Sequence, residues 1–285
     1  MLDIHLIRER PEEVKAAIAR LHTTAPIDEI VDLDGRRRAL LTEVEALKAE
    51  RNEGSKTVNR TRDPEQRQQL IENLRTIGDT IDQLDAQTKA IDEELRDLLL
   101  SVPNLPLPDV PDGPDESANV VVREVGEQRS FAFSPRPHWE IAEQLGIIDF
   151  ERGVKVSGSR FYVLRGDAAR LQRALITWML DLHVKKHGYQ EVYPPFMVLQ
   201  EMLVGTGQLP KFGDGQFHDA YDDKWMIPTA EVPVTNLYRD EILDEELLPI
   251  YHVAYTACFR REQLSAGRDV RGIKRGYQFD KVELV

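Results

Sequence analysis

The amino-acid sequence predicts an α+β fold, in which an antiparallel two-helix coiled-coil arm at the N-terminus precedes an antiparallel β-sheet domain. Three observations support this. Residues 28–100 carry apolar side chains at coiled-coil spacing, residues 104–135 are rich in proline and aspartate, and residues 256–285 alternate apolar with charged side chains in two runs. These features divide the chain into an arm domain at 1–103, a linker at 104–135 and a second domain at 136–285.

The composition is that of a globular protein with an excess of acidic residues. The chain has 285 residues, enough for two domains of about 100–200 residues. Fifty acidic against 37 basic residues give a net charge of −13, which argues against indiscriminate nucleic-acid binding, because that needs a broad basic surface. The single cysteine, Cys258, cannot form an internal disulfide. Since no apolar run approaches the roughly 20 residues of a membrane span and no signal-peptide core opens the chain, we expect a cytoplasmic protein without membrane contact.

Residues 1–26 are expected to form a small cap. Pro11 suits the first turn of a helix, and Glu12 and Glu13 place carboxylates near its positive end. Apolar residues at helical spacing follow, which predicts a short amphipathic helix. They are Val14, Ala17, Ile18 and Leu21.

The strongest periodic signal predicts the two helices of the arm. Core positions between residues 70 and 98 follow the 4,3,4,3 spacing of a coiled-coil seam, and only Thr88 among them is not apolar. A weaker series between residues 33 and 51 keeps the same step. Since residues 54–64 are polar and hold helix breakers, we expect a turn there and an antiparallel hairpin. The two series are Leu70, Leu74, Ile77, Ile81, Leu84, Thr88, Ile91, Leu95 and Leu98, and Leu33, Arg37, Leu40, Val44, Leu47 and Arg51.

A hairpin of this length has to project from any small core, because residues 70–98 alone span about 43 Å at 1.5 Å per residue. The commonest use of such an arm is dimerisation or protein binding. An alternative is contact with RNA, because basic residues gather toward the tip, although acidic neighbours dilute them. The basic residues are Lys48, Arg51, Lys56, Arg60, Arg62 and Arg67, and the acidic ones are Glu50, Glu53, Asp63 and Glu65.

Beyond the arm, prolines at 103, 106, 108 and 111 favour a semi-rigid extended linker. In the second domain Asp167 would cap a long helix and Gly188 would end it. Core packing alone accounts for this layout. The expected elements are a helix at 137–145, a strand at 161–164, the long helix at 168–187 and a strand at 189–193.

The last thirty residues predict a strand, a loop and a second strand. Because side chains alternate along a strand, Arg260 and Glu262 would share one face of the first strand, and Phe279, Lys281 and Glu283 one face of the second. Paired strands would bring a guanidinium, an aromatic ring and carboxylates to one surface, where they could hold a nucleotide and an ammonium. A solvated hairpin with surface salt bridges is the simpler interpretation of the same spacing.

Several short sequence motifs indicate a particular family more specifically than this spacing does. FRRE at 259–262, SAGRDVRG at 265–272 and QFDKVE at 278–283 resemble, in order and spacing, motif 2 of class II aminoacyl-tRNA synthetases in its seryl-tRNA synthetase version. GTGQLPKF at 205–212 and PTAEVPVTN at 228–236 are similar to further phrases of that family. The resemblance runs along the whole chain, as an N-terminal portion that ends after motif 2.

The resemblance implies a tRNA-binding arm and a partial class II catalytic domain with motifs 1 and 2. It implies a serine–tRNA ligase that uses ATP to form seryl-adenylate and passes the seryl group to tRNA(Ser), with tRNA(Sec) as a further acceptor within the family. Arg260 would be the catalytic residue, because a guanidinium can bridge the α-phosphate and the serine carboxylate. The implied ATP site is Arg260, Arg261, Glu262, Gly276 and Phe279, and the implied serine site is Thr229, Ala230, Glu231, Arg260 and Glu283.

The resemblance also implies partners. The long helix, the following strand and Pro195 would form motif 1 and a homodimer interface. Scattered cations suffice to recognise the shape of an RNA helix, since the contacts are to its backbone. Outside this family, Thr229 and Glu231 would be a simple capping pair. The implied tRNA contacts are Arg51, Lys56, Arg60, Arg62 and Arg271.

Three positions depart from the family pattern. Gln263 and Leu264 follow Glu262 where relatives have small residues, and Tyr277 stands where histidine is common. Motif 3 and the residues that would bind Mg²⁺ are expected beyond Val285, so no metal ligand is assigned, and we expect these 285 residues to be inactive alone.

Two alternatives stay open. One is a non-catalytic RNA- or protein-binding paralogue, against which the intact motif 2 residues argue. The other is a ligase that loads an amino acid onto a carrier protein, against which the long seam argues.

Overall fold

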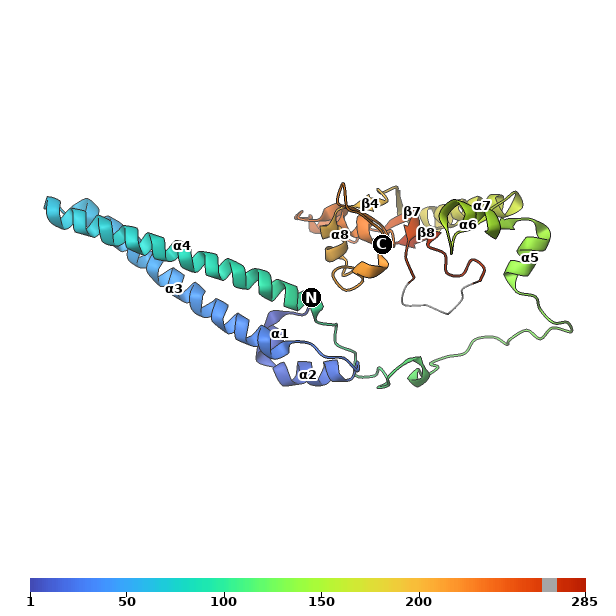
Figure 1. The fold of residues 1–285 in the computed structure, drawn as a ribbon, viewed down its shortest axis with the longest axis horizontal. Coiled ribbons are helices and arrows are strands. Elements are labelled where there is room, and N and C mark those ends of the chain that lie inside the picture. Colours follow the sequence, from blue (N-terminus) through green and yellow to red (C-terminus); the bar gives the residue numbers. More distant parts are fainter. Residues whose placement is uncertain (263–270) are drawn as a thin grey trace. The chain divides into compact units, whose positions relative to one another are not determined.

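The computed structural model describes residues 1–262 and 271–285. They form two compact units, Met1–Gly126 and Glu127–Val285, and the boundary lies inside the segment predicted as a linker. The α+β prediction is confirmed, with two paired helices followed by small sheets (Figure 1). In the described ranges, every helix lacks the combination of length and apolar character that a membrane crossing requires.

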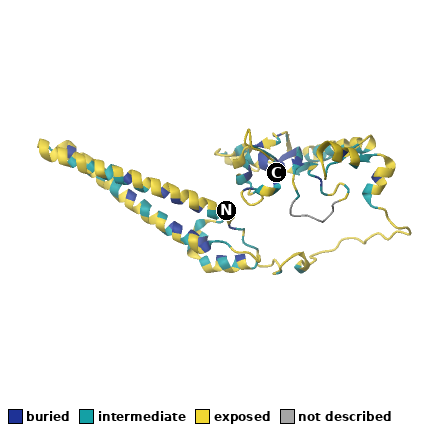
Figure 2. Ribbon diagram, in the orientation of Figure 1, coloured by how far each residue is buried: buried dark blue, intermediate teal, exposed yellow. Residues whose placement is uncertain are grey.

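Four helices build the first unit: α1 (Ile4–Glu9), α2 (Pro11–Ala19), α3 (Ile27–Arg60) and α4 (Pro64–Ser101). As predicted, α2 starts at Pro11. Helices α1 and α2 pack against the open end of the α3–α4 hairpin and enclose its core (Figure 2). The buried members of this core are Ile7, Val14, Ile18, Ile27, Ile30, Leu33, Ile91, Leu95 and Val102.

The predicted seam lies between α3 and α4, which run side by side in Figure 1. Every seam position is buried or half-buried. Thr88 fits the seam because its hydroxyl donates to the Leu84 carbonyl oxygen at 2.8 Å. Arg37 occupies its seam position by pairing with Asp92 across the hairpin.

The predicted turn at 54–64 is wrong in extent, because α3 continues to Arg60. The reason is that the seam itself continues, through Gly54 to the buried Val58. A Cβ atom on Gly54 would lie 2.6 Å from Leu74 Cδ2, so this glycine admits a side chain of α4 instead of breaking the helix. The turn shrinks to residues 61–63, and Asp63 caps α4 by accepting the Gln66 N–H at 2.8 Å.

The residues that follow α4 are fastened to the first unit. Arg20 donates to the Val110 carbonyl oxygen at 2.7 Å, and His22 Nε2 lies 3.0 Å from Asp112 Oδ1. Leu105 packs against the core of this unit. The first part of the predicted linker therefore lies against α2 and its following turn, and a single short helical turn, η1 (Glu116–Ala118), follows.

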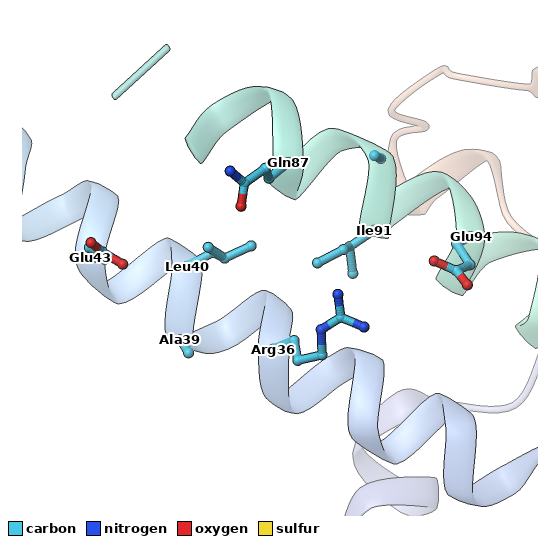
Figure 3. Close-up of a pocket in the computed structure, with 8 residues that line it drawn as sticks. Arg36, Ala39, Leu40, Glu43, Gln87, Ile91 and Glu94 are labelled. Carbon is cyan, nitrogen blue, oxygen red and sulfur yellow. The ribbon is translucent and has the colours of Figure 1, made fainter. Parts of the chain in front are cut away.

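A groove of about 480 Å³ lies between α3 and α4 (Figure 3). The small side chains of Ala39 and Ala90 leave it open, and its border carries one base, Arg36, and two acids, Glu43 and Glu94. This mixed charge does not mark it as a contact for an RNA backbone, which prefers cations.

In the second unit, α7 (Asp167–His187) ends at Gly188, which takes the predicted left-handed conformation with φ 74°. Its N-cap is Gly166 and not Asp167, which is already the first helical residue. The helices before and after it are α5 (His138–Leu145), α6 (Phe150–Ser157), α8 (Gln200–Gly205) and α9 (Glu231–Thr235), with short turns η2 (Gly213–Gly215), η3 (Asn236–Tyr238) and η4 (Glu245–Leu247).

Among the described residues, three small sheets accompany these helices. The sheet that matters for the site has the order β3-β7-β8, formed by β3 (Gln190–Val192), β7 (His252–Phe259) and β8 (Gln278–Leu284). Strands β7 and β8 pair antiparallel, whereas β3 pairs parallel to β7, and α7 packs against all three. The other two sheets are β1-β2 (Ile148–Asp149 with Val163–Leu164) and β4-β6-β5 (Met197–Val198, Lys224–Met226 and His218–Asp219).

Candidate active site

The strand β8 divides its side chains between two environments. Opposite Phe279, Lys281 and Glu283 stand Cys258, Thr256 and Ala254 of β7. The intervening Asp280 accepts hydrogen bonds from the Tyr255 hydroxyl, at 2.8 Å, and from Gln172 of α7. The predicted alternation of β8 is therefore present, because Asp280 turns toward α7 while its neighbours form a separate cluster.

The β7 strand ends one residue before Arg260, so the predicted strand does not extend to Glu262. Glu262 has a left-handed backbone, with φ 51°, and the period-two argument for these two residues fails there. The backbone of Arg260 still pairs with the neighbouring segment, because its N–H donates to the Tyr277 carbonyl oxygen at 2.9 Å.

The guanidinium of Arg260 lies 5.2 Å from the centre of the Phe279 ring. Its Nε donates to the Pro228 carbonyl oxygen at 3.2 Å, which joins the end of β7 to the 228–231 loop. The side chain is otherwise exposed. A fixed guanidinium beside an aromatic face is therefore available to an incoming anion with a planar ring.

Arg261 and Glu262, which follow Arg260 in the chain, make separate contacts. Arg261 lies over the Phe217 ring at 4.9 Å, and Glu262 Oε2 is 3.3 Å from Arg275 Nη1. Gly276 is buried, and a Cβ atom on it would lie 3.1 Å from Tyr162 Cε1. Gly276 thus has a packing reason to lack a side chain, and its predicted contact with ATP stays a prediction.

Tyr277, which departs from the family pattern, is a packing residue. Its ring lies 5.8 Å from the Phe161 ring and 6.0 Å from the Phe217 ring, and Arg160 lies over it at 5.7 Å. The other departure, Gln263 and Leu264, and the loop at 265–270 lie outside the described residues.

A hydrogen-bonded cluster joins the 228–231 loop to β8. The buried Thr229 hydroxyl donates to Glu283 Oε2 at 2.6 Å, and Lys281 Nζ lies 2.5 Å from the same hydroxyl oxygen and 2.7 Å from Glu283 Oε2. The Glu231 N–H also donates to Glu283 Oε2, at 3.2 Å. The cluster joins side chains more than fifty positions apart in the chain.

Glu283 carries the negative charge of this cluster. Burial raises the pKa of its carboxyl, but hydrogen bonds from Lys281 and Thr229 outweigh burial and bring the pKa below the ordinary value. Lowering the pKa favours the ionised form, so the carboxylate is negative at neutral pH. The side chain of Glu231 is exposed, whereas Ala230 is fully buried against Val234 and Ala254 and contributes packing.

Lys281 is the residue that sequence reasoning missed. Alternation placed it on the face of Phe279 and Glu283, but it was not included in the serine site. Its ammonium contacts both Thr229 and Glu283. The signal that could have found it is that same period of two along β8.

The predicted tRNA contacts fall in both units. Arg60 and Arg62 are exposed beside the turn of the hairpin, Lys56 pairs with Glu53 at 2.9 Å, and Arg51 is half-buried in the seam. Arg271 is exposed in the second unit. Their contact with RNA stays a prediction.

Comparison with known proteins connects these features to a family. Residues 1–106 match the seryl-tRNA synthetase N-terminal domain, and residues 215–285 match the tRNA synthetase class II core domain (G, H, P, S and T). The serine–tRNA ligase of Thermomicrobium roseum is 63% identical over all 285 residues, and that of Chloroflexus aurantiacus is 58% identical. The chain spans 64% and 67% of the lengths of these two relatives.

Solved structures agree with the sequence matches. A crystal structure of seryl-tRNA synthetase from Pyrococcus horikoshii complexed with ATP superposes with a TM-score of 0.89 at 35% identity, covering 100% of this chain and 69% of that one. A serine–tRNA ligase from Naegleria fowleri in complex with AMP gives a TM-score of 0.81 at 29% identity, covering 100% of this chain and 66% of that one. On these grounds, the chain belongs to the seryl-tRNA synthetase family of class II aminoacyl-tRNA synthetases.

Proposed function

We propose that the protein is a serine–tRNA ligase, which activates L-serine with ATP and transfers it to tRNA(Ser). The observation that carries this proposal is the junction at Pro228, where the Arg260–Phe279 pair meets the Thr229–Lys281–Glu283 cluster. The arginine–phenylalanine pair suits a nucleotide, and the hydrogen-bonded cluster suits an amino acid. The ATP and AMP complexes of the two structural neighbours support the nucleotide assignment.

In this proposal Arg260 neutralises the negative charge that gathers when the serine carboxylate attacks the α-phosphate. The step needs alignment and charge stabilisation, and a planar guanidinium provides two parallel N–H donors. Phe279, 5.2 Å from the guanidinium carbon, would stack on the adenine ring. Arg261, Glu262 and Gly276 remain proposed ATP contacts by resemblance.

Serine recognition is assigned to Thr229, Ala230, Glu231 and Glu283, together with Lys281. Among the described residues, the hydrogen bonds of the Glu283 carboxylate fall on Oε2, which leaves Oε1 for the serine ammonium or hydroxyl. A half-buried acceptor that pairs with the serine hydroxyl rejects alanine and glycine, because the absent hydroxyl leaves it unpaired.

Serine-dependent ATP–pyrophosphate exchange by the full-length protein tests this proposal. We expect exchange with serine and at least about 100-fold lower kcat/KM with alanine or glycine. Exchange with another amino acid in preference to serine, or charging of a carrier protein in place of tRNA, would reject it. The names of the relatives and the uninterrupted seam of the arm favour tRNA as the acceptor.

A divalent cation such as Mg²⁺ is expected to accompany ATP. The described residues bring together no group of three His, Cys, Asp or Glu side chains that could hold a metal ion, and Glu283 is already paired with Lys281. These residues do not fit a metal site by themselves, so we derive no step through the metal.

For tRNA, we propose that the tip of the hairpin contacts the RNA backbone through Arg51, Lys56, Arg60 and Arg62. Arg271 would contact the acceptor end of the tRNA or ATP. Charging of purified tRNA(Sec) with radiolabelled serine tests whether it is a second acceptor. We place the reaction in the cytoplasm, where ATP, serine and tRNA occur together.

We also propose that the protein is a homodimer whose interface includes the outer face of α7. Leu171, Leu175 and Trp178 are 60%, 43% and 59% exposed although they lie at helical spacing on one stripe. An apolar stripe of this kind is costly to leave in water and is typical of an interaction surface.

Replacing Trp178 with aspartate is expected to convert the dimer to a monomer at micromolar concentration, because it places a charge in an apolar contact. Sedimentation velocity measures the change. Val156→Asp is the matched control, since Val156 is 79% exposed on α6, away from the stripe. A Trp178→Asp protein that sediments like the unmodified dimer would remove α7 from the interface.

A further inference from the structure

We propose that His138 is a positioning residue that holds the backbone at Gly272 and Ile273 and thereby sets the place of the Arg271 guanidinium. The catalytic consequence rests on the proposed function, whereas the contact itself does not. His138 opens α5, more than 130 positions before the segment it contacts.

Both His138 and the 272–273 segment are adapted to this contact. His138 Nε2 accepts the Ile273 N–H at 2.9 Å. A Cβ atom on Gly272 would lie 2.0 Å from His138 Nε2 and 2.4 Å from its Cε1, and Gly272 has φ +83°. The ring therefore occupies the space that any other residue at position 272 would fill, in a conformation that favours glycine.

The geometry fixes the state of the imidazole. Because Nε2 accepts from a backbone N–H, it carries a lone pair and the ring is neutral, with its proton on Nδ1. The edge of the Trp139 ring, 5.1 Å away between centres at 78°, supports the orientation of the imidazole. A glutamine amide reaches about as far as Nε2 and can accept the same hydrogen bond, whereas leucine fills the volume without an acceptor.

The segment held in this way is cationic. Between residues 271 and 275 it carries Arg271, Lys274 and Arg275. At its far end it has a second anchor, because Arg275 pairs with Glu262 at 3.3 Å and its carbonyl oxygen accepts from Arg160 Nη1 at 3.4 Å. His138 holds the backbone at Gly272 and Ile273, directly after Arg271, and the second anchor holds it at Arg275. The backbone next to Arg271 is therefore placed for its guanidinium to meet a phosphate group.

Hydrogen exchange of the full-length protein tests the contact directly. In His138→Leu, the Ile273 amide is expected to exchange about three- to tenfold faster, the usual effect of losing one hydrogen bond, whereas His138→Gln stays near the unmodified rate. Gly272→Ala is a second disruption from the opposite side and should accelerate exchange as His138→Leu does. Glu140→Gln, an exposed change on the same helix, is the control.

Steady-state kinetics test whether His138 affects the phosphate contact of Arg271, with ATP and tRNA as the two possible sources of the phosphate. His138→Leu is expected to raise KM about three- to tenfold for ATP in pyrophosphate exchange, or for tRNA in charging, while KM for serine is unchanged; the assay that responds identifies the phosphate that Arg271 contacts. Unchanged Ile273 exchange in His138→Leu, or unchanged KM for both ATP and tRNA, would overturn the proposal. If the unmodified protein shows no serine-dependent exchange, the proposed function fails, and the amide measurement still decides the role of His138 as an anchor.

Discussion

Arg260→Ala is expected to lower kcat of serine-dependent ATP–pyrophosphate exchange by a factor of about 10²–10³, the usual cost of removing one group that stabilises transition-state charge. The side chain is exposed, and among the described residues it makes one hydrogen bond, to the Pro228 carbonyl oxygen, besides its contact with Phe279. Its loss should therefore leave the fold intact. Steady-state exchange rates, with a thermal melt to confirm folding, measure the effect.

The Arg260→Lys variant distinguishes the contribution of the positive charge from that of the planar guanidinium. Lysine keeps one positive charge but lacks the planar pair of donors, so we expect it to recover only part of the lost rate. Arg152→Ala serves as the control, because Arg152 is an exposed arginine of α6 that pairs with Asp149. An Arg260→Ala protein that retained kcat within about threefold of the unmodified protein would exclude Arg260 as the charge-stabilising group.

Glu283→Ala is expected to abolish serine-dependent exchange, and Glu283→Gln to reduce kcat/KM for serine by about 100-fold or more, because a charged hydrogen-bond acceptor is lost from a partly buried site. The amide keeps the shape of the carboxylate but removes the charge that Lys281, 2.7 Å away, neutralises. ATP affinity should be little changed, since Phe279 and Arg260 are untouched.

The measurement is a serine titration at saturating ATP, accompanied by ATP binding in the absence of serine. Glu245→Gln provides the control, because Glu245 is an exposed acid in the η4 turn of the same unit. Normal serine affinity in Glu283→Ala would refute the assignment, and weakened ATP binding would indicate a disturbance of β8 as a whole.

Local periodicity accounts for what the sequence predicted well. The seam from Leu70 to Leu98 recurs at the helical repeat, so it predicted α4 and its partner, and the apolar–charged alternation after Tyr277 predicted the two faces of β8. A glycine predicted as a helix stop gave the right result at Gly188, which ends α7, and the wrong one at Gly54, through which α3 continues. Glycine is a helix breaker by type, but Gly54 belongs to the seam and makes room for Leu74.

The sequence by itself determined the two-helix arm, the β7–β8 pair and, through its phrases, the family, because these depend on residues near one another in the chain. Tertiary structure alone decided that Thr229 bonds to Glu283, that Lys281 joins them and that His138 lies on Gly272. These contacts join residues 52 to 135 positions apart. No spacing along the chain encodes them, since they arise only when β8, the 228–231 loop and α5 pack into one unit.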